Sequence, residues 1–297
     1  MLPELRTALL DLLHELHGTD VNLIIGGGYG IYLRTENVSQ LGVRTLLKVW
    51  SEARSTNDLD LFLRPELLID SDKAALLKEA LTNLGYNPIT GVENYQFKKP
   101  GPNGGAAGSI KIDLLTGPKS SFNNTIVRVD ERRARPRPSV GLHAHPTDEA
   151  VTLEEGLLNR TLNGNLSSGE SWEGQVYLPN SFTFLMMKLF AFRDKINNEN
   201  KEFGRYHALD LYSIIASTTE SEWDYALSLR DRYKKQEYVM EAGDLVQEYF
   251  SKYDRLGIVR MQESLYYRRE FQLDEFMSAI QELFPVTAET SEDVSEY

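Results

Sequence analysis

The segment at residues 58–63, DLDLFL, constrains the fold of this chain more than any other part of the sequence. Its residues alternate between acidic or aromatic side chains and leucine. Successive side chains of a β-strand point to opposite faces of a sheet. We therefore predict a strand whose three leucines enter a core, while Asp58 and Asp60 lie together on the opposite face.

Further helix and strand patterns surround this segment in the first half of the chain. The N-terminal sequence MLPELRTALLDLLHELHG has leucines at helical spacing and a stop at its final glycine. The other predicted elements are a strand at Val21–Ile25, a helix at Asp72–Leu84, and strands at Val92–Phe97 and Ser109–Leu115. Residues 116–170 are rich in Gly, Pro, Asn and Ser, which indicates loops with one helix considered at Leu153–Arg160.

The second half of the chain has helical patterns only. Asn180 or Ser181 can cap a helix that continues to about Lys195, and further patterns occupy 205–217, 221–235, 237–252 and 271–284. We predict an α+β fold in which residues 1–170 form a domain with a mixed sheet and flanking helices, and residues 171–285 form an all-helical domain. Residues 286–297 are acidic and nearly devoid of apolar side chains, so we expect a disordered tail. Residues 35–53 are too apolar to be a simple linker.

Composition narrows the class of protein. The 297 residues contain no cysteine and no run of about 18 apolar residues, and the N-terminus lacks a basic region before its apolar residues. These features favour a soluble, cytoplasmic protein without a membrane partner. A formal net charge of −12 opposes indiscriminate binding to nucleic acid, so we expect no DNA partner. The exception is Arg128–Arg137, with five arginines. This segment is either a solvated loop or a binding site for an acceptor that carries phosphate.

Three carboxylates in this pattern indicate a metal site. Asp58 and Asp60 share a strand face, and two adjacent carboxylates cannot both ionise cheaply without a cation. Asp113 is the one acid within the apolar strand SIKIDLLTG, and a lone buried carboxylate usually has a partner. Oxygen ligands suit Mg²⁺ or Mn²⁺. The alternatives are a surface strand with chance acids, and an aspartate that caps a turn at the end of a strand.

A glycine turn precedes the acidic strand. Gly26, Gly27 and Gly28 follow the apolar run Val21–Ile25 and come before a helical stretch. Such a turn exposes backbone N–H groups and lets phosphates approach closely, although a purely structural turn has the same sequence.

The combination of a glycine turn after a strand, D-x-D on the next strand and an isolated Asp on a later strand resembles the DNA polymerase β-like nucleotidyltransferase superfamily. Within it, IIGGGYGIYLR and RSTNDLDLFL resemble the AbiEii/MenT toxin group, whose second motif reads R-x-S/T-x-D-h-D-h-F. Arg54 and Thr56 fit that motif together with the two acids. The resemblance implies that the glycine turn holds nucleotide phosphates, that Asp58, Asp60 and Asp113 bind two metals, and that Arg54 and Thr56 contact the nucleotide. The distance from the glycine turn to Asp58 is longer than in that group, so residues 35–53 resemble an insertion.

The second half of the chain extends the resemblance. SFTFLMMKLFAFRDK and GRYHALDLYSII are similar to the later motifs of the same group, with Lys188 and Asp210 at the matching positions. The resemblance implies that Lys188 contacts phosphate and that both residues serve catalysis. Lys188 lies among apolar residues, so snorkelling is the alternative. Arg193 is a further candidate for nucleotide binding, and an ion pair with Asp194 is the alternative.

We therefore expect an enzyme that moves a nucleoside monophosphate from an NTP to an acceptor hydroxyl. By resemblance the acceptor is the 3′ end of a tRNA, and the chain is the toxin of a toxin–antitoxin pair with an antitoxin protein as partner. A second hypothesis keeps this chemistry with a small-molecule or protein acceptor. The third is a non-catalytic protein that binds a nucleotide or a partner protein.

Overall fold

The computed structural model describes residues 2–52, 56–101, 108–198, 200 and 202–286. These residues form two compact units. The first consists of the chain up to Arg44 together with Glu52–Met187, and the second consists of Thr45–Ser51 and the chain from Lys188 onward. The tail predicted at 286–297 lies outside the described residues after its first position.

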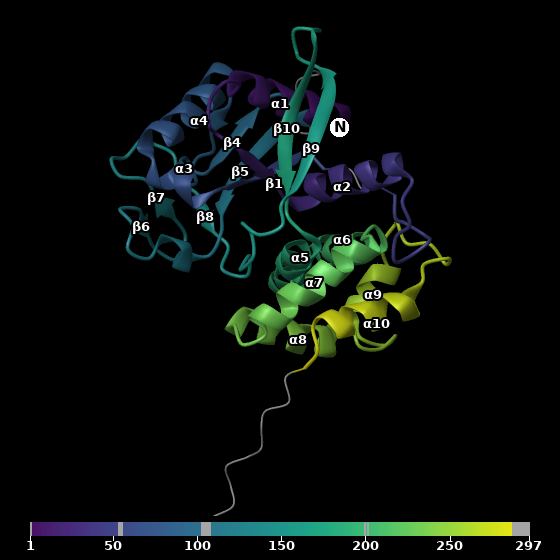
Figure 1. Cartoon of the computed structure of the whole chain (residues 1–297). Coiled ribbons are helices and arrows are strands. Elements are labelled where there is room, and N and C mark those ends of the chain that lie inside the picture. The colour runs from purple at the N-terminus through teal and green to yellow at the C-terminus, as the bar shows by residue number, and fades with distance from the viewer. Residues whose placement is uncertain (1, 53–55, 102–107, 199, 201, 287–297) are drawn as a thin grey trace, which may run out of the picture. The chain divides into compact units, whose positions relative to one another are not determined.

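The elements alternate in the first unit and are helical in the second (Figure 1). The helices are α1 (Leu2–Glu15), α2 (Gly27–Leu41), α3 (Pro65–Ile69), α4 (Ser71–Asn83), α5 (Ser181–Lys195), α6 (Glu202–Ala216), α7 (Glu220–Tyr233), α8 (Glu237–Tyr249), α9 (Leu256–Gln262) and α10 (Leu273–Leu283), with a 3₁₀ helix η2 at Lys119–Phe122. The strands are β1 (Leu23–Ile25), β2 (Asp58–Leu63), β3 (Asn87–Pro88), β4 (Gln96–Lys99), β5 (Ile110–Thr116), β6 (Arg128–Val129), β7 (Ala134–Arg135), β8 (His145–Pro146), β9 (Leu158–Asn165) and β10 (Ser171–Leu178).

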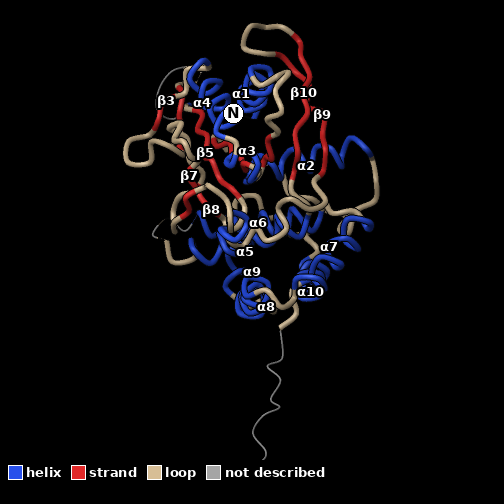
Figure 2. The backbone as a smooth tube through the Cα atoms, turned by 60° about the vertical axis from the view of Figure 1, so that its left-hand side comes forward, coloured by secondary structure: helices blue, strands red, loops and turns tan. Residues whose placement is uncertain are grey.

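The first unit is built on a mixed sheet, so its fold is α+β as predicted. The strand order is β3-β4-β5-β2-β1-β10-β9, and β8 pairs with the end of β5. The pairs β2–β5, β1–β10 and β5–β8 are parallel, and the other neighbours are antiparallel. Figure 2 shows β9 and β10 as a long hairpin at one edge of the sheet.

Strand β2 lies in the middle of this sheet and has the predicted alternation. Leu59, Leu61 and Leu63 are fully buried, whereas Asp58 and Asp60 are only partly buried. Strand β5 follows the same rule, with Ile110, Ile112, Leu114 and Thr116 buried between partly exposed residues. Helices α1 and α4 supply apolar side chains such as Leu9, Leu12, Leu77 and Leu81 to the core of this unit. One face of β2 and β5 is therefore apolar and the other carries their polar side chains.

Side-chain caps explain where several helices begin. Asp70 accepts hydrogen bonds from the backbone N–H groups of Asp72 and Lys73 at the start of α4. At the start of α5, Asn180 Oδ1 accepts from Thr183 N at 2.8 Å, so Asn180 is the cap of the two candidates that the sequence offered. These bonds satisfy N–H groups that have no partner within the first helical turn.

Two elements predicted in the first unit differ from the structure, one in type and one in extent. The helix considered at Leu153–Arg160 is instead a turn followed by β9, which pairs with β10 along its whole length. That hairpin belongs to the sheet, and the first compact unit includes it and continues to Met187 within α5. The strand predicted at Val92–Phe97 begins only at Gln96, since Val92–Tyr95 forms a turn.

The stretch predicted as an insertion at 35–53 has two parts. Its beginning continues α2, which ends where Gly42 adopts a left-handed conformation. Residues 45–51 belong to the second unit, in which Leu46 N donates to Thr218 O and Tyr212 Oη donates to Val49 O. Lys48 N donates to Gln272 Oε1 at 2.6 Å. The apolar character of this stretch therefore reflects packing within the helical unit.

Among the residues that the structure describes, none of the helices combines the length and the apolar character needed to cross a membrane.

Candidate active site

The three predicted carboxylates come together on the open face of the sheet. Asp60 of β2 lies directly opposite Asp113 of β5 in the parallel register, and Asp58 lies opposite Lys111. Residues in register on neighbouring strands point to the same face. The pairing of two strands that are distant in sequence thus places Asp113 beside the D-x-D pair.

The pKa of Asp113 is raised partly because the other two aspartates lie close to it. Burial, together with the neighbouring charges of Asp60 and Asp58, raises the pKa of Asp113 from its ordinary value of 3.8 to about 7, while Lys111 acts in the opposite direction. The Oδ1 atom of Asp113 is buried and accepts no hydrogen bond from any described residue. The charge of Asp113 beside two other carboxylates is therefore only partly compensated by the side chains around it.

The glycine turn lies against the same carboxylates. Gly26 N donates a hydrogen bond to Asp60 O at 2.9 Å. Gly27 has φ +59, and a Cβ added there would overlap Asp60 Oδ2 and lie 2.5 Å from its Cγ. A Cβ at Gly26 would meet the ring of Phe62. Only glycine allows the backbone to approach the acidic strand this closely.

The structure describes two of the three other residues predicted to contact the nucleotide in the first unit, Gly28 and Thr56. Gly28 lies in the first turn of α2. The hydroxyl of Thr56 accepts a hydrogen bond from Asp58 N at 3.4 Å and so contacts the start of β2. Arg54 lies outside the described residues.

The sequence interpretation missed Lys111. Its Nζ lies 3.8 Å from Asp58 Oδ1, and both side chains are partly exposed. The alternation in SIKIDLL contains the signal, because it puts Lys111 on the same face as Asp113. This lysine provides a positive charge beside the acids.

The acids have the chemistry of a magnesium site. Their ligand atoms are all carboxylate oxygens, and the uncompensated charge around Asp113 would be relieved by a divalent cation. Among the described residues, no group of three or more His, Asp or Glu side chains is already arranged to hold one metal ion. Mg²⁺ commonly uses one or two carboxylates and completes its coordination with substrate phosphates and water. The residue types present fit that mode of binding.

Lys188 and Asp210 belong to the second unit, where they contact each other. Lys188 Nζ lies 2.8 Å from Asp210 Oδ2, and the two side chains are 8% and 6% exposed. The motif positions from two different helices, α5 and α6, thus form one buried ion pair. Removing one partner of such a pair leaves an uncompensated buried charge, which is strongly destabilising.

Arg193, also in the second unit, forms the ion pair that the sequence offered as an alternative to nucleotide binding. Its guanidinium pairs with Asp194 at 2.8 Å and with Glu241, and it lies 4.6 Å from the centre of the Phe190 ring. The nucleotide contact of Arg193 stays a prediction.

The arginine-rich segment forms a small hairpin tied to β5. Strands β6 and β7 pair with each other, and His145 of β8 lies opposite Leu115 of β5, two residues beyond Asp113. Two residues along a strand span roughly 7 Å. His145 Nδ1 lies 2.9 Å from Arg132 O, which fixes the hairpin near this end of β5.

Side chains of this hairpin form a basic and aromatic surface. The guanidinium of Arg133 lies 5.5 Å from the centre of the Tyr95 ring, and the rings of Tyr95 and His145 are 6.3 Å apart. Arg135 pairs with Asp130. In the described part of the chain, the exposed side chains of Arg128, Arg132 and Arg137 have no ion-pair partner. Positive charge is therefore concentrated here on a protein whose net charge is −12.

No protein-family model matches this chain, and a search of curated proteins finds no match to it either.

Proposed function

We propose that this protein is a metal-dependent nucleotidyltransferase that moves a nucleoside monophosphate from an NTP to an acceptor hydroxyl. The observation that carries the proposal is the register of β2 and β5, which sets Asp60 opposite Asp113, with the glycine turn against Asp60. Nucleotide transfer needs carboxylates for a divalent metal and backbone N–H groups for the triphosphate, and the three acids and the adjacent glycine turn can supply both. The motif resemblance to AbiEii/MenT nucleotidyltransferases supports the same activity.

The glycine turn and the three aspartates of the first unit each have a role in the proposed reaction. The backbone N–H groups of Gly27 and Gly28 hold the triphosphate, while Gly26 N donates to Asp60 O and fixes the turn against β2. Asp58, Asp60 and Asp113 would hold Mg²⁺ or Mn²⁺. Bound there, the divalent ion neutralises charge on the phosphates and on the attacking and leaving oxygens. The acceptor oxygen bonds to the α-phosphorus, the bond to the β-phosphate oxygen breaks, and pyrophosphate leaves. Asp113 also accepts the proton of the acceptor hydroxyl.

The resemblance assigns the second unit a supporting part. Lys188 contacts a substrate phosphate, and Asp210 holds its ammonium group in place through the ion pair of 2.8 Å. The only support for a role of Arg193 in nucleotide binding is its position in the same motif.

The acceptor that fits the hairpin surface is the end of an RNA. Arg132 and Arg133 offer charge for phosphates, and Tyr95 offers a ring on which a base can stack. The surface adjoins the end of β5 that follows Asp113. The resemblance names the 3′ end of tRNA and adds an antitoxin protein as a partner. The acidic remainder of the chain favours the runner-up, a cationic small molecule as acceptor.

The first test of the proposal is label transfer. Purified protein is incubated with Mg²⁺, each α-³²P-labelled NTP in turn and total tRNA, beside an Asp58→Ala variant. We expect label in tRNA with the wild type and a loss of roughly 1,000-fold in the variant, because one of the metal-binding carboxylates is gone. Label in the protein itself would assign a protein acceptor. Equal transfer by both proteins would overturn the site.

The hairpin surface makes a second prediction. Arg132→Gln is expected to weaken RNA binding several-fold and to reduce the slope of log affinity against log salt concentration by about 1, because one phosphate contact is lost. The affinity for NTP should not change. Fluorescence titrations at several salt concentrations measure both. Lys235→Gln, which removes an equally exposed charge from the second unit, is the matched control. An unchanged salt slope for Arg132→Gln would place the acceptor elsewhere.

A further inference from the structure

Two lysines lie next to each other on the open face of the sheet, in the same row as Asp58. Lys111 of β5 is opposite Asp58 of β2 in the parallel register, and it is opposite Lys98 of β4 in the antiparallel register. Residues in register on neighbouring strands point to the same face, and the strands lie about 4.8 Å apart. The open face therefore carries one acid and two bases in a row across β2, β5 and β4.

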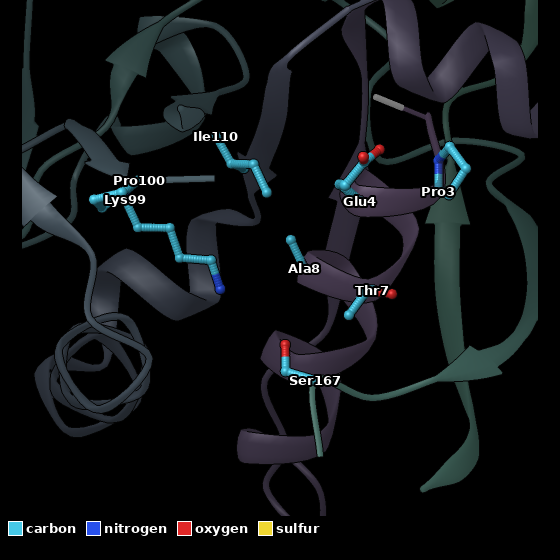
Figure 3. A pocket seen from close by; sticks show the side chains of 8 residues that line it. All are labelled: Pro3, Glu4, Thr7, Ala8, Lys99, Pro100, Ile110 and Ser167. Atoms are coloured by element: carbon cyan, nitrogen blue, oxygen red, sulfur yellow. The ribbon is translucent and has the colours of Figure 1, made fainter. Parts of the chain in front are cut away.

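The burial pattern of β4 agrees with this position of Lys98. Phe97 is fully buried, whereas Lys98 is exposed. Lys99 returns to the apolar face, where it lies opposite Ile110 and lines a cavity together with residues of α1 (Figure 3). Lys98 thus belongs to the surface that carries the three acids, and Lys99 does not.

The lysine pair has little negative charge of its own to balance it. Like charges directly opposite each other on antiparallel strands destabilise a sheet. The side chain of Lys98 forms no ion pair with any described residue, and its outer neighbour in the sheet is the neutral Asn87 of β3. Lys111 Nζ lies 3.8 Å from Asp58 Oδ1, which is too far for a hydrogen bond. In the proposed reaction Asp58 binds a divalent cation, so its charge is then no longer available to Lys111.

The strand order places the lysine pair on one side of the acids and the glycine turn on the other. Strand β2 lies between β1 and β5, and the glycine turn follows β1. A triphosphate held by that turn lies on the β1 side of Asp60, whereas the lysines lie on β5 and β4. Asp113, the proposed base for the acceptor hydroxyl, is on β5 as well, and two residues along a strand span roughly 7 Å. The substrate that comes nearest the lysines is therefore the acceptor.

We propose that Lys98 and Lys111 bind the phosphodiester that precedes the terminal nucleoside of an RNA acceptor. This inference rests on the proposed function and identifies a charged group of the acceptor that the open face recognises. The negative phosphodiester offsets the repulsion between the two ammonium groups. The hairpin surface meets β5 at Leu115, on the other side of Asp113. A cationic small molecule is disfavoured as acceptor, because two lysines beside the acceptor hydroxyl repel it.

The test is a binding cycle between one lysine and one phosphate. A fluorescein-labelled single-stranded RNA of about 12 nucleotides is titrated with the full chain and Mg²⁺ in the absence of NTP. A second RNA carries an uncharged methylphosphonate in place of the last phosphodiester. We expect Lys98→Gln to weaken the unmodified RNA about fivefold and to reduce the slope of log affinity against log salt concentration by about 0.7. The same variant should weaken the methylphosphonate RNA by less than about twofold, because the charge that Lys98 meets is already absent.

The controls separate this effect from a change in the fold or in the metal site. Lys98 forms no ion pair with the acids, so its replacement leaves their charges in place. Lys73→Gln removes a partly exposed lysine of α4 and should leave the affinity for both RNAs unchanged. Helix α4 packs on the apolar face, where Lys78 Nζ lies 4.5 Å from the centre of the Phe97 ring. The affinity for NTP should be the same for wild type and Lys98→Gln, and urea unfolding shows that each variant is folded.

The proposal is overturned if Lys98→Gln weakens the two RNAs equally, if it leaves the unmodified RNA unaffected, or if it weakens NTP in place of RNA. Because the titrations contain no NTP, their result is independent of the transfer activity. Asp58-dependent label transfer without coupling between Lys98 and the last phosphodiester would remove the lysine site and keep the transferase. Coupling without Asp58-dependent transfer would support the lysine site and remove the proposed function.

Discussion

Gly27→Ala is expected to reduce nucleotide transfer by roughly 100-fold and to lower the free energy of unfolding by about 2–4 kcal/mol. The added Cβ overlaps Asp60 Oδ2, and the residue has φ +59, which an L-amino acid rarely adopts. Either the turn or the carboxylate must move. Both belong to the proposed site, so displacement by about 1 Å is sufficient for the loss of rate. Radiolabel transfer and urea unfolding measure the two effects.

Gly18→Ala separates the collision with Asp60 from the cost of backbone conformation. Gly18 also has a positive φ, +80, but a Cβ there meets nothing within 4 Å. Gly18→Ala should lower the free energy of unfolding by only about 1 kcal/mol and leave nucleotide transfer unchanged. If Gly27→Ala behaves like Gly18→Ala in both measurements, the glycine turn does not position the carboxylate and its role in the site is wrong.

The local parts of this site were predictable from the sequence. Alternation in β2 gives the buried leucines and the shared face of Asp58 and Asp60, since both follow from the two-residue period of a strand. The N-cap at Asn180 follows from the hydrogen-bonding chemistry of one side chain. Such features depend on a few neighbouring residues, so the sequence contains all the information needed.

The meeting of Asp60 and Asp113 was predictable only through the motif resemblance. It depends on parallel pairing between strands far apart in the chain, and a shift of one residue in register would turn Asp113 to the other face. No local pattern fixes that register. The same applies to the ion pair of Lys188 and Asp210, which joins two helices.

The hairpin of β9 and β10 shows where pattern reading fails for a different reason. The sequence LNRTLNGN has one fully buried residue, Leu162, and little apolar alternation because β9 is an edge strand. Tertiary contacts support it instead. Arg6 and Thr7 of α1 donate hydrogen bonds to the carbonyl oxygens of Asn163 and Asn165, each at 3.1 Å. Contacts from a distant helix leave no trace in the pattern of the strand.

Asp113→Asn is expected to stabilise the metal-free protein at pH 8 while it removes transfer. In the folded state the pKa of Asp113 is raised from 3.8 to about 7. The folded protein therefore binds more protons than the unfolded chain between these values, and stability falls as pH rises from about 4 to 7. Above pH 7 this carboxylate costs about 4 kcal/mol, and asparagine removes the charge without a large change in shape.

Urea unfolding with EDTA at pH 4.5 and pH 8 measures this effect. The free energy of unfolding of Asp113→Asn should exceed that of the wild type at pH 8. The two values should be close at pH 4.5, where Asp113 of the folded protein is mostly protonated. Glu79→Gln, which neutralises an exposed acid on α4, is the control and should change little at either pH. Adding Mg²⁺ at pH 8 should then stabilise the wild type but not Asp113→Asn, because a ligand that binds only the folded state raises its stability. A variant less stable than the wild type at pH 8 would mean that Asp113 is held by favourable partners, and the case for an uncompensated carboxylate waiting for a cation would fail.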